Sequence, residues 1–153
     1  MKVAINGFGR IGRQVFKLAL ANNLEVVAIN DLHDLDNLLY LLKYDSVYGK
    51  YDKKLKIQSG FLHVGSRKIK LLSEKDPRKL PWKKLKVDCV VEATGVFRDP
   101  KLARSHVKAG AKHVLITAPC KSNAPDLTVV PGVNHKKLKK EHQIISVASC
   151  TTN

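Results

Sequence analysis

Residues 3–13 read Val-Ala-Ile-Asn-Gly-Phe-Gly-Arg-Ile-Gly-Arg, and this stretch decides the fold. The apolar residues Val3–Ile5 predict a short buried strand. The next residues, Gly7–Gly12, form a G-x-G-x-x-G motif. Apolar residues then recur at helical spacing from Ile11 to Ala21. The stretch therefore predicts a strand, a tight turn and an amphipathic helix, which is how many α/β folds begin.

Each glycine of the motif has a physical role. Gly7 permits the tight turn, Gly9 removes a side chain that would block a pyrophosphate, and Gly12 lets the helix pack closely on the strand. The free N–H groups at the start of the helix then face the phosphates. Asp31 follows a second apolar run, 19 positions beyond Gly12, and its carboxylate can accept both ribose hydroxyls of an adenosine. Because Asp31 would repel a 2′-phosphate, we expect the cofactor to be NAD rather than NADP.

The rest of the chain predicts a Rossmann-like, doubly wound α/β fold with a mostly parallel sheet. Helices are expected after Asp34, which resembles an N-cap, and from about residue 100 to 109. Further strands are expected at residues 26–29, 87–91, 113–116, 127–130 and 144–147. Residues 45–72 depart from this alternation, because Phe61–Val64 and Lys68–Leu71 flank a Gly-Ser turn as in a hairpin. We interpret residues 45–72 as a short antiparallel excursion from the main sheet.

The composition sets limits on the class of protein. The chain has 153 residues, 44% of them hydrophobic and 27% charged, which suits one globular α/β domain. No apolar run has the length of a membrane span, and no signal-peptide block follows Met1. We therefore expect a soluble, cytoplasmic protein with no membrane partner.

The net charge of +15 raises the alternative of a basic module that binds nucleic acid. The excess lies after residue 42 in short lysine runs, which are more typical of solvated loops and helix ends. Aromatic residues make up only 6% of the chain and are not interleaved with the lysines. We expect any nucleic-acid binding to be incidental.

Three cysteines, Cys89, Cys120 and Cys150, lie far apart along the chain. Their odd number disfavours a disulfide framework and a zinc site, so we expect no metal. Cys150 follows the last predicted strand, and Ser149 before it resembles a helix N-cap. A helix N-terminus stabilises a thiolate. Position alone leaves a catalytic role for Cys150 open, whereas Cys89 and Cys120 have the pattern of structural residues.

Four segments together resemble the glyceraldehyde-3-phosphate dehydrogenase family. They are residues 3–13, Ile29–Asp31, Glu92–Phe97 and the final Ala-Ser-Cys-Thr-Thr-Asn of residues 148–153. The resemblance runs in order along the whole chain. It implies a nucleophile at Cys150 and an inorganic-phosphate site at Ser149 and Thr151. It also implies an NAD site at Arg10, Ile11, Asp31, Thr94, Gly95, Phe97 and Thr117.

The resemblance further implies a reaction and a domain organisation. The thiolate of the family attacks glyceraldehyde 3-phosphate, the thiohemiacetal passes hydride to the nicotinamide, and phosphate splits the thioester to 1,3-bisphosphoglycerate. Residues 1–150 would be the NAD-binding domain, and residues 151–153 would start an active-site helix leading to a catalytic domain outside this chain. None of the six histidines lies in a motif like the catalytic one of the family. We expect the chain to bind NAD without turning over, and the full-length parent to be a homotetramer.

Some residues depart from the family pattern, and two related activities stay open. Lys75 stands where the family often has an arginine near the adenine, which keeps the charge but loses a planar stacking surface. Val147 replaces a common asparagine near Cys150. A sister enzyme acting on erythrose 4-phosphate stays open, because the groups that specify the sugar would come mostly from the half of the family that lies outside this chain. Aspartate-semialdehyde dehydrogenase fits less well, because its cysteine motif lacks the pair Thr151-Thr152.

Overall fold

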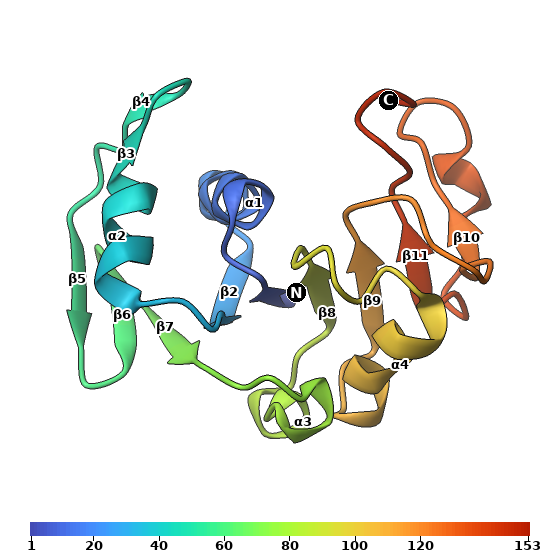
Figure 1. Ribbon diagram of the computed structural model, residues 1–153, viewed down its shortest axis with the longest axis horizontal. Helices are drawn as coiled ribbons and strands as arrows, with labels where there is room; N and C mark the ends of the chain where they lie inside the picture. The colour runs from blue at the N-terminus through green and yellow to red at the C-terminus, as the bar shows by residue number, and fades with distance from the viewer.

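Nine strands form one sheet in the order β10-β11-β9-β8-β1-β2-β7-β6-β5 in the computed structural model, which describes all residues from 1 to 153. The first strand, β1 (Lys2–Asn6), pairs in parallel with β2 (Glu25–Asn30) on one side and with β8 (Cys89–Glu92) on the other. The chain therefore winds outward from β1 in both directions (Figure 1). In such doubly wound sheets, ligands bind outside the carboxyl ends of the two strands where the direction changes. Here those strands are β1 and β8.

The strands beyond β8 all run parallel to it. In spatial order they are β9 (His113–Ile116), β11 (Ile144–Ser146) and β10 (Leu127–Thr128). Three predicted strands are shorter than expected, and the one predicted at 144–147 loses only its last residue. The strand predicted at 127–130 spans only Leu127–Thr128, although Val129 N still donates to Ser146 O at 2.8 Å. The strand predicted at 87–91 begins at Cys89, because Val87 closes the preceding helical turn on Trp82 O at 3.0 Å.

The antiparallel stretch predicted at 45–72 is confirmed. Three strands form an antiparallel meander, β5 (Leu55–Gln58), β6 (Phe61–Val64) and β7 (Arg67–Leu72). This meander is joined to the main sheet, because β7 pairs in parallel with β2. A separate two-stranded sheet is made by β3 (Tyr44–Asp45) and β4 (Gly49–Lys50).

Helices cover both faces of the sheet. They are α1 (Arg10–Ala21), α2 (Leu35–Lys43), α3 (Trp82–Leu85) and α4 (Pro100–Lys108), with 3-10 turns η1 (Pro77–Lys79) and η2 (His135–Lys137). The predicted cap of α2 is confirmed, since the Asp34 carboxylate accepts from Asn37 N at 2.9 Å. None of these helices combines the length and the apolar character that crossing a bilayer requires.

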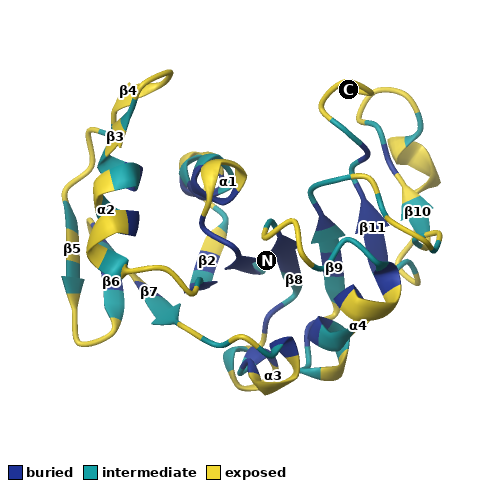
Figure 2. Ribbon diagram, viewed as in Figure 1, coloured by how far each residue is buried: buried dark blue, intermediate teal, exposed yellow.

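Alternate residues of the central strands pack into different cores. Val3 and Ile5 of β1 join the larger core under α1 and α2, whereas Ala4 between them joins a second core around Trp82. A third, smaller core lies between α4, β9 and β11. This alternation is the two-residue period of a strand buried on both faces. Figure 2 shows the result, with the buried residues concentrated along the central strands.

Candidate functional site

A cavity of about 490 Å³ opens at the carboxyl edge of β1, β2 and β8. Its walls come from the turn after β1, from the end of β2 with the three residues that follow it, and from the loop after β8, where Ala93, Thr94, Val96 and Phe97 face the cavity. Of the residues predicted from sequence, it brings together Gly7, Gly9, Asp31, Thr94 and Phe97. The cavity therefore lies at the place where the winding of the sheet changes direction.

Two glycines of the motif are required by close packing. Gly7 has φ +91°, and a Cβ there would lie 2.6 Å from Thr94 N. A Cβ on Gly12 would lie 2.0 Å from Gly7 O, so this glycine lets α1 approach the end of β1. Both roles agree with the predictions from the sequence.

Gly9 differs from the other two glycines. Its φ is −72°, which any residue can adopt, and a Cβ there would meet no atom within 4 Å. The packing of the protein therefore gives no reason for a glycine at this position. The open space lies at the N-terminus of α1, where no side chain caps the helix and the first turn carries no acidic residue. An uncapped helix N-terminus with room in front of it fits a pyrophosphate.

The Asp31 carboxylate accepts hydrogen bonds from the glycine turn after β1 and from the segment after β2. Its Oδ2 accepts from Phe8 N at 2.6 Å, inside the glycine turn, and its Oδ1 accepts from His33 N at 2.9 Å. Burial acts to raise the pKa of the Asp31 carboxyl, but hydrogen bonds from His33 and Phe8 outweigh it and hold the pKa below its usual value. The side chain is thus a carboxylate at neutral pH, as an acceptor of ribose hydroxyls must be.

His33 was not predicted as a site residue, yet its ring contacts the Asp31 carboxylate. His33 Nδ1 lies 2.7 Å from Asp31 Oδ1, and the imidazole is otherwise largely exposed. A ribose hydroxyl has to share this oxygen with His33 or displace the ring. The only signal in the sequence was the spacing of two residues, which lets a side chain fold back on its neighbour.

A buried polar network underlies the cavity, and sequence reasoning missed it. Asn6, Asn30 and Glu92 are the last residues of β1, β2 and β8 and face one another in register. Asn6 Nδ2 donates to Glu92 Oε2 at 2.6 Å, and Asn30 Nδ2 donates to Asn6 Oδ1 at 2.7 Å. Glu74 N closes the chain by donating to Asn30 Oδ1 at 2.8 Å. Three neighbouring strand ends are therefore linked by side chains beneath the ligand space.

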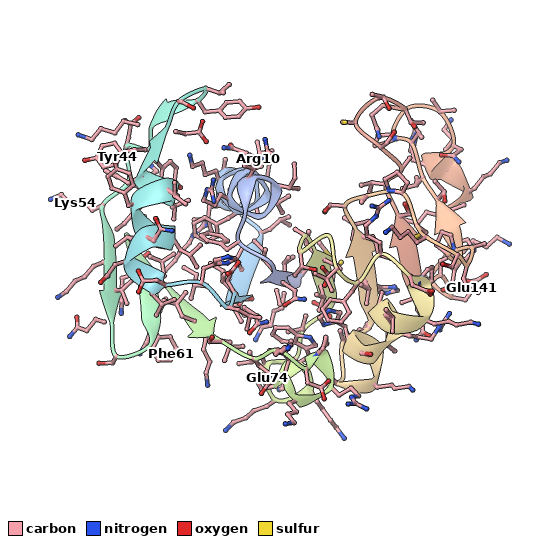
Figure 3. All side chains as sticks on the ribbon, viewed as in Figure 1. Arg10, Tyr44, Lys54, Phe61, Glu74 and Glu141 are labelled. Atoms are coloured by element: carbon pink, nitrogen blue, oxygen red, sulfur yellow. The ribbon has the colours of Figure 1, made fainter.

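Other predicted site residues lie around the cavity rather than in its wall. Arg10 and Ile11 are exposed on the first turn of α1, where Figure 3 labels Arg10. Gly95 has φ +75°, and a Cβ there would meet no atom within 4 Å. Thr117 follows β9, and both its N–H and its hydroxyl donate to Glu92 O at 3.1 Å. Lys75, the departure from the family near the adenine, does line the cavity.

Cys150 is exposed in a turn after β11. The Ser149 hydroxyl accepts from Thr152 N at 3.1 Å, as an N-cap does, and lies 2.9 Å from Thr151 Oγ1. Asn153 N donates to Ser149 O at 3.1 Å, which is a single helical hydrogen bond. The Ser149 hydroxyl also lies 2.7 Å from Thr152 Oγ1, so three hydroxyls and the thiol share one short turn.

Burial disfavours the thiolate form of Cys89 and Cys120, which the sequence predicts to be structural residues. Burial raises the pKa of Cys89 to about 11, and burial also raises the pKa of Cys120. A thiolate is the nucleophilic form, so both residues stay protonated at neutral pH.

A cleft of this kind, formed where a doubly wound sheet reverses around a glycine turn, is characteristic of dinucleotide-binding domains. Residues 1–100 match the family model described as the NAD-binding domain of glyceraldehyde 3-phosphate dehydrogenase, and the chain belongs to that family. The cofactor of the domain is accordingly NAD. The open position at Gly9 and the ionised Asp31 fit this cofactor.

Relatives in several organisms resemble the chain over its full length. It is 54% identical to the glyceraldehyde-3-phosphate dehydrogenase of Thermotoga maritima over 99% of its residues. It is 51% identical to glyceraldehyde-3-phosphate dehydrogenase 1 of Streptomyces arenae and 50% identical to the cytosolic enzyme of Trypanosoma brucei brucei, in both cases over 100% of its residues. The chain spans 46% of the length of each of these relatives.

Proposed function

We propose that this chain is the coenzyme-binding part of a phosphorylating, NAD-dependent glyceraldehyde-3-phosphate dehydrogenase. The observation that carries the proposal is the cavity at the reversal point of the sheet, which brings Gly9, Asp31 and Thr94 together. The relatives, all named as this enzyme, support the choice of reaction.

The residues around the cavity divide between the two halves of the cofactor. Asp31 would hold the adenosine ribose, and the N–H groups near Arg10 and Ile11 would bind the pyrophosphate. The loops after β8 and β9 would line the nicotinamide half, with Gly95 and Phe97 in the first and Thr117 in the second. This division follows from the opposite positions of β2 and β9 on either side of β1 and β8.

For the reaction, we propose Cys150 as the nucleophile. Its thiolate would attack the aldehyde carbon of glyceraldehyde 3-phosphate and form a C–S bond. Bound NAD⁺ supplies the hydride acceptor. The thioester left on Cys150 would then be split by inorganic phosphate, held by Ser149 and Thr151, to release 1,3-bisphosphoglycerate and the thiolate.

Turnover also requires a base and an acid. No histidine of this chain makes a hydrogen bond to Cys150: His106 is buried against Trp82, and His113 and His142 bond elsewhere in the fold. We therefore propose that the 153 residues alone bind NAD without turning over. The domain boundary at residue 150, assembly of the full-length protein as a homotetramer and a cytoplasmic location belong to the same proposal. The cytosolic relative supports the location.

Calorimetric titration of the chain with NAD and with NADP tests the proposal. We expect measurable NAD binding and at least tenfold weaker NADP binding, because Asp31 repels a 2′-phosphate; roughly tenfold corresponds to 1.4 kcal/mol. Equal or tighter binding of NADP would contradict the role of Asp31. A parallel assay of NADH formation with glyceraldehyde 3-phosphate and phosphate tests the expected lack of turnover.

A further inference from the structure

Glu92 is a buried carboxylate surrounded only by hydrogen-bond donors. Its side chain is 1% exposed. Oε2 accepts from Asn6 Nδ2 at 2.6 Å and lies 3.1 Å from His106 Nε2. Oε1 accepts from Thr94 N at 2.8 Å and, in a shorter contact, from the Thr94 hydroxyl. A buried carboxylate persists only when donors replace its water, and here donors fill both oxygens.

The groups that donate hydrogen bonds to Glu92 cannot easily become acceptors. Trp82 Nε1, which can only donate, lies 2.9 Å from His106 Nδ1. His106 Nδ1 is therefore the acceptor, so the ring carries its proton on Nε2 and donates it to Glu92. Both Trp82 and His106 are fully buried, so bulk solvent does not compete for this hydrogen bond.

Asn6 is fixed in the same way from the other side. Its Oδ1 accepts from Asn30 Nδ2, so turning the amide over would bring two NH₂ groups together. An amide in place of Glu92 would thus present its own NH₂ to donors at one of its two ends. The site selects a carboxylate over its isosteric amide.

Through Thr94, this carboxylate shapes the wall of the cavity. The Thr94 hydroxyl donates to Glu92 and accepts from Val96 N at 3.0 Å. Its proton is therefore used in a bond within the protein and is not available to a ligand. Thr94, Val96 and Phe97 all line the cavity. The Phe97 ring also packs edge-on against His106, with ring centroids 6.2 Å apart. The lip Thr94–Phe97 is therefore held from below by Glu92 and His106.

We propose that Glu92 is a positioning residue of the NAD site, which sets the lip Thr94–Phe97 in its cofactor-binding conformation and requires a carboxylate to do so. This inference rests on the proposed function, because it assigns the lip to the nicotinamide half of the cofactor. It gives Thr94 a structural use for its hydroxyl in place of a direct bond from that proton to the cofactor.

The test compares Glu92→Gln, Thr94→Val and Thr94→Ser by calorimetry with NAD and with ADP-ribose, which lacks the nicotinamide. We expect Glu92→Gln and Thr94→Val to bind NAD roughly tenfold more weakly, the scale of one lost bond to a charged group. Both variants should bind ADP-ribose within about twofold of the wild type, since it lacks only the nicotinamide ring and Asp31 makes no hydrogen bond to Glu92 or Thr94. Thr94→Ser keeps the hydroxyl and should bind NAD as the wild type does.

Asp88→Asn is the matched control. It makes the same carboxylate-to-amide change at the opposite end of the same strand, where Asp88 bonds Lys112 and Lys2 N away from the cavity. It should leave NAD binding unchanged. The ¹⁵N spectrum of His106 gives a second readout and should show the proton on Nε2; a proton on Nδ1 would overturn the network.

Different results would contradict the proposed function and the positioning role of Glu92. A wild-type chain that binds neither NAD nor ADP-ribose contradicts the proposed function. A wild-type chain that binds NAD, with Thr94→Val binding it equally well, overturns the positioning role alone. Equal losses for NAD and ADP-ribose in Glu92→Gln and Thr94→Val would show a general structural effect and would also overturn it.

Discussion

At the scale of single residues, Asp31 has to serve the cofactor while it holds the glycine turn. It receives hydrogen bonds from Phe8 N and His33 N and keeps a lowered pKa. We expect Asp31→Asn to weaken NAD binding roughly tenfold, the scale of a bond to a charged group. The preference for NAD over NADP should shrink as well, because the repulsion of the 2′-phosphate is removed. Calorimetry with both cofactors measures each effect.

Asp36→Asn provides the control for charge in that experiment. Asp36 is exposed on the first turn of α2 and lies outside the wall of the cofactor cavity, and its substitution changes the net charge by the same amount. If Asp36→Asn shifted the NADP affinity as much as Asp31→Asn does, the preference would come from the overall charge rather than from a contact.

A second carboxylate predicts a pH dependence of stability. The Asp76 side chain caps η1, and hydrogen bonds from the Arg78 guanidinium and backbone N–H lower the pKa of Asp76 from 3.8 to about 2. Since the folded pKa is the lower one, the stabilisation is complete above pH 4 and is lost as the pH falls from about 4 to about 2. We expect the wild type to be more stable than Asp76→Asn at pH 6, with the gap closing by pH 2. Urea unfolding at several pH values measures this gap.

Residue identity along the chain predicted only part of the site. The glycines and Asp31 were predictable because their spacing is local and each has a distinct chemistry. Glu92 was not, because its partner Asn6 lies 86 positions away and an isolated glutamate in a strand carries no mark of its neighbours. A buried charged side chain can be predicted only when the hydrogen-bond donors that surround it in the fold are known.

At the scale of elements, the turn between β1 and α1 and the start of α1 contain one glycine that packing requires, Gly12, and one that packing does not require, Gly9. Gly12→Ala would place a Cβ 2.0 Å from Gly7 O, so we expect it to lower the free energy of unfolding by about 3 kcal/mol. Gly9→Ala meets no protein atom and should cost at most about 1 kcal/mol as a helix N-cap. It should nevertheless weaken NAD binding by more than tenfold, because the methyl group enters the space of the pyrophosphate.

Denaturant unfolding and NAD calorimetry on the same two variants check this contrast. A Gly9→Ala variant with unaltered NAD affinity would show that the pyrophosphate lies elsewhere. The helix and the hairpin were predictable from local patterns, as the Asp34 cap and the turn between β6 and β7 show. The parallel pairing of β7 with β2 was not, since it joins segments that no short-range pattern links.

At the scale of the whole molecule, the positive charge is dispersed. Lysine runs lie at residues 53–56 at the start of the edge strand β5, at 83–86 around α3 and at 136–140 around η2, and their lysines are exposed. These elements lie on separate sides of the molecule in Figure 1, and Figure 3 shows Lys54 at one end of it with Glu141 at the other. The charge of +15 therefore does not gather in one groove. Its distribution over the surface depends on the strand order, which the sequence alone did not reveal.

This dispersion predicts how the chain meets a polyanion. We expect a single-stranded oligonucleotide to bind at low salt and to be released near physiological ionic strength, with log K falling linearly against log salt. NAD should not compete, because the lysine runs lie outside the cofactor cavity. Replacing Lys53, Lys54 and Lys56 with glutamine should reduce the salt slope as much as replacing Lys83, Lys84 and Lys86, since each run acts only as three charges. A slope that depends on one run alone, or binding that survives physiological salt and yields to NAD, would instead place a specific nucleic-acid site on this domain.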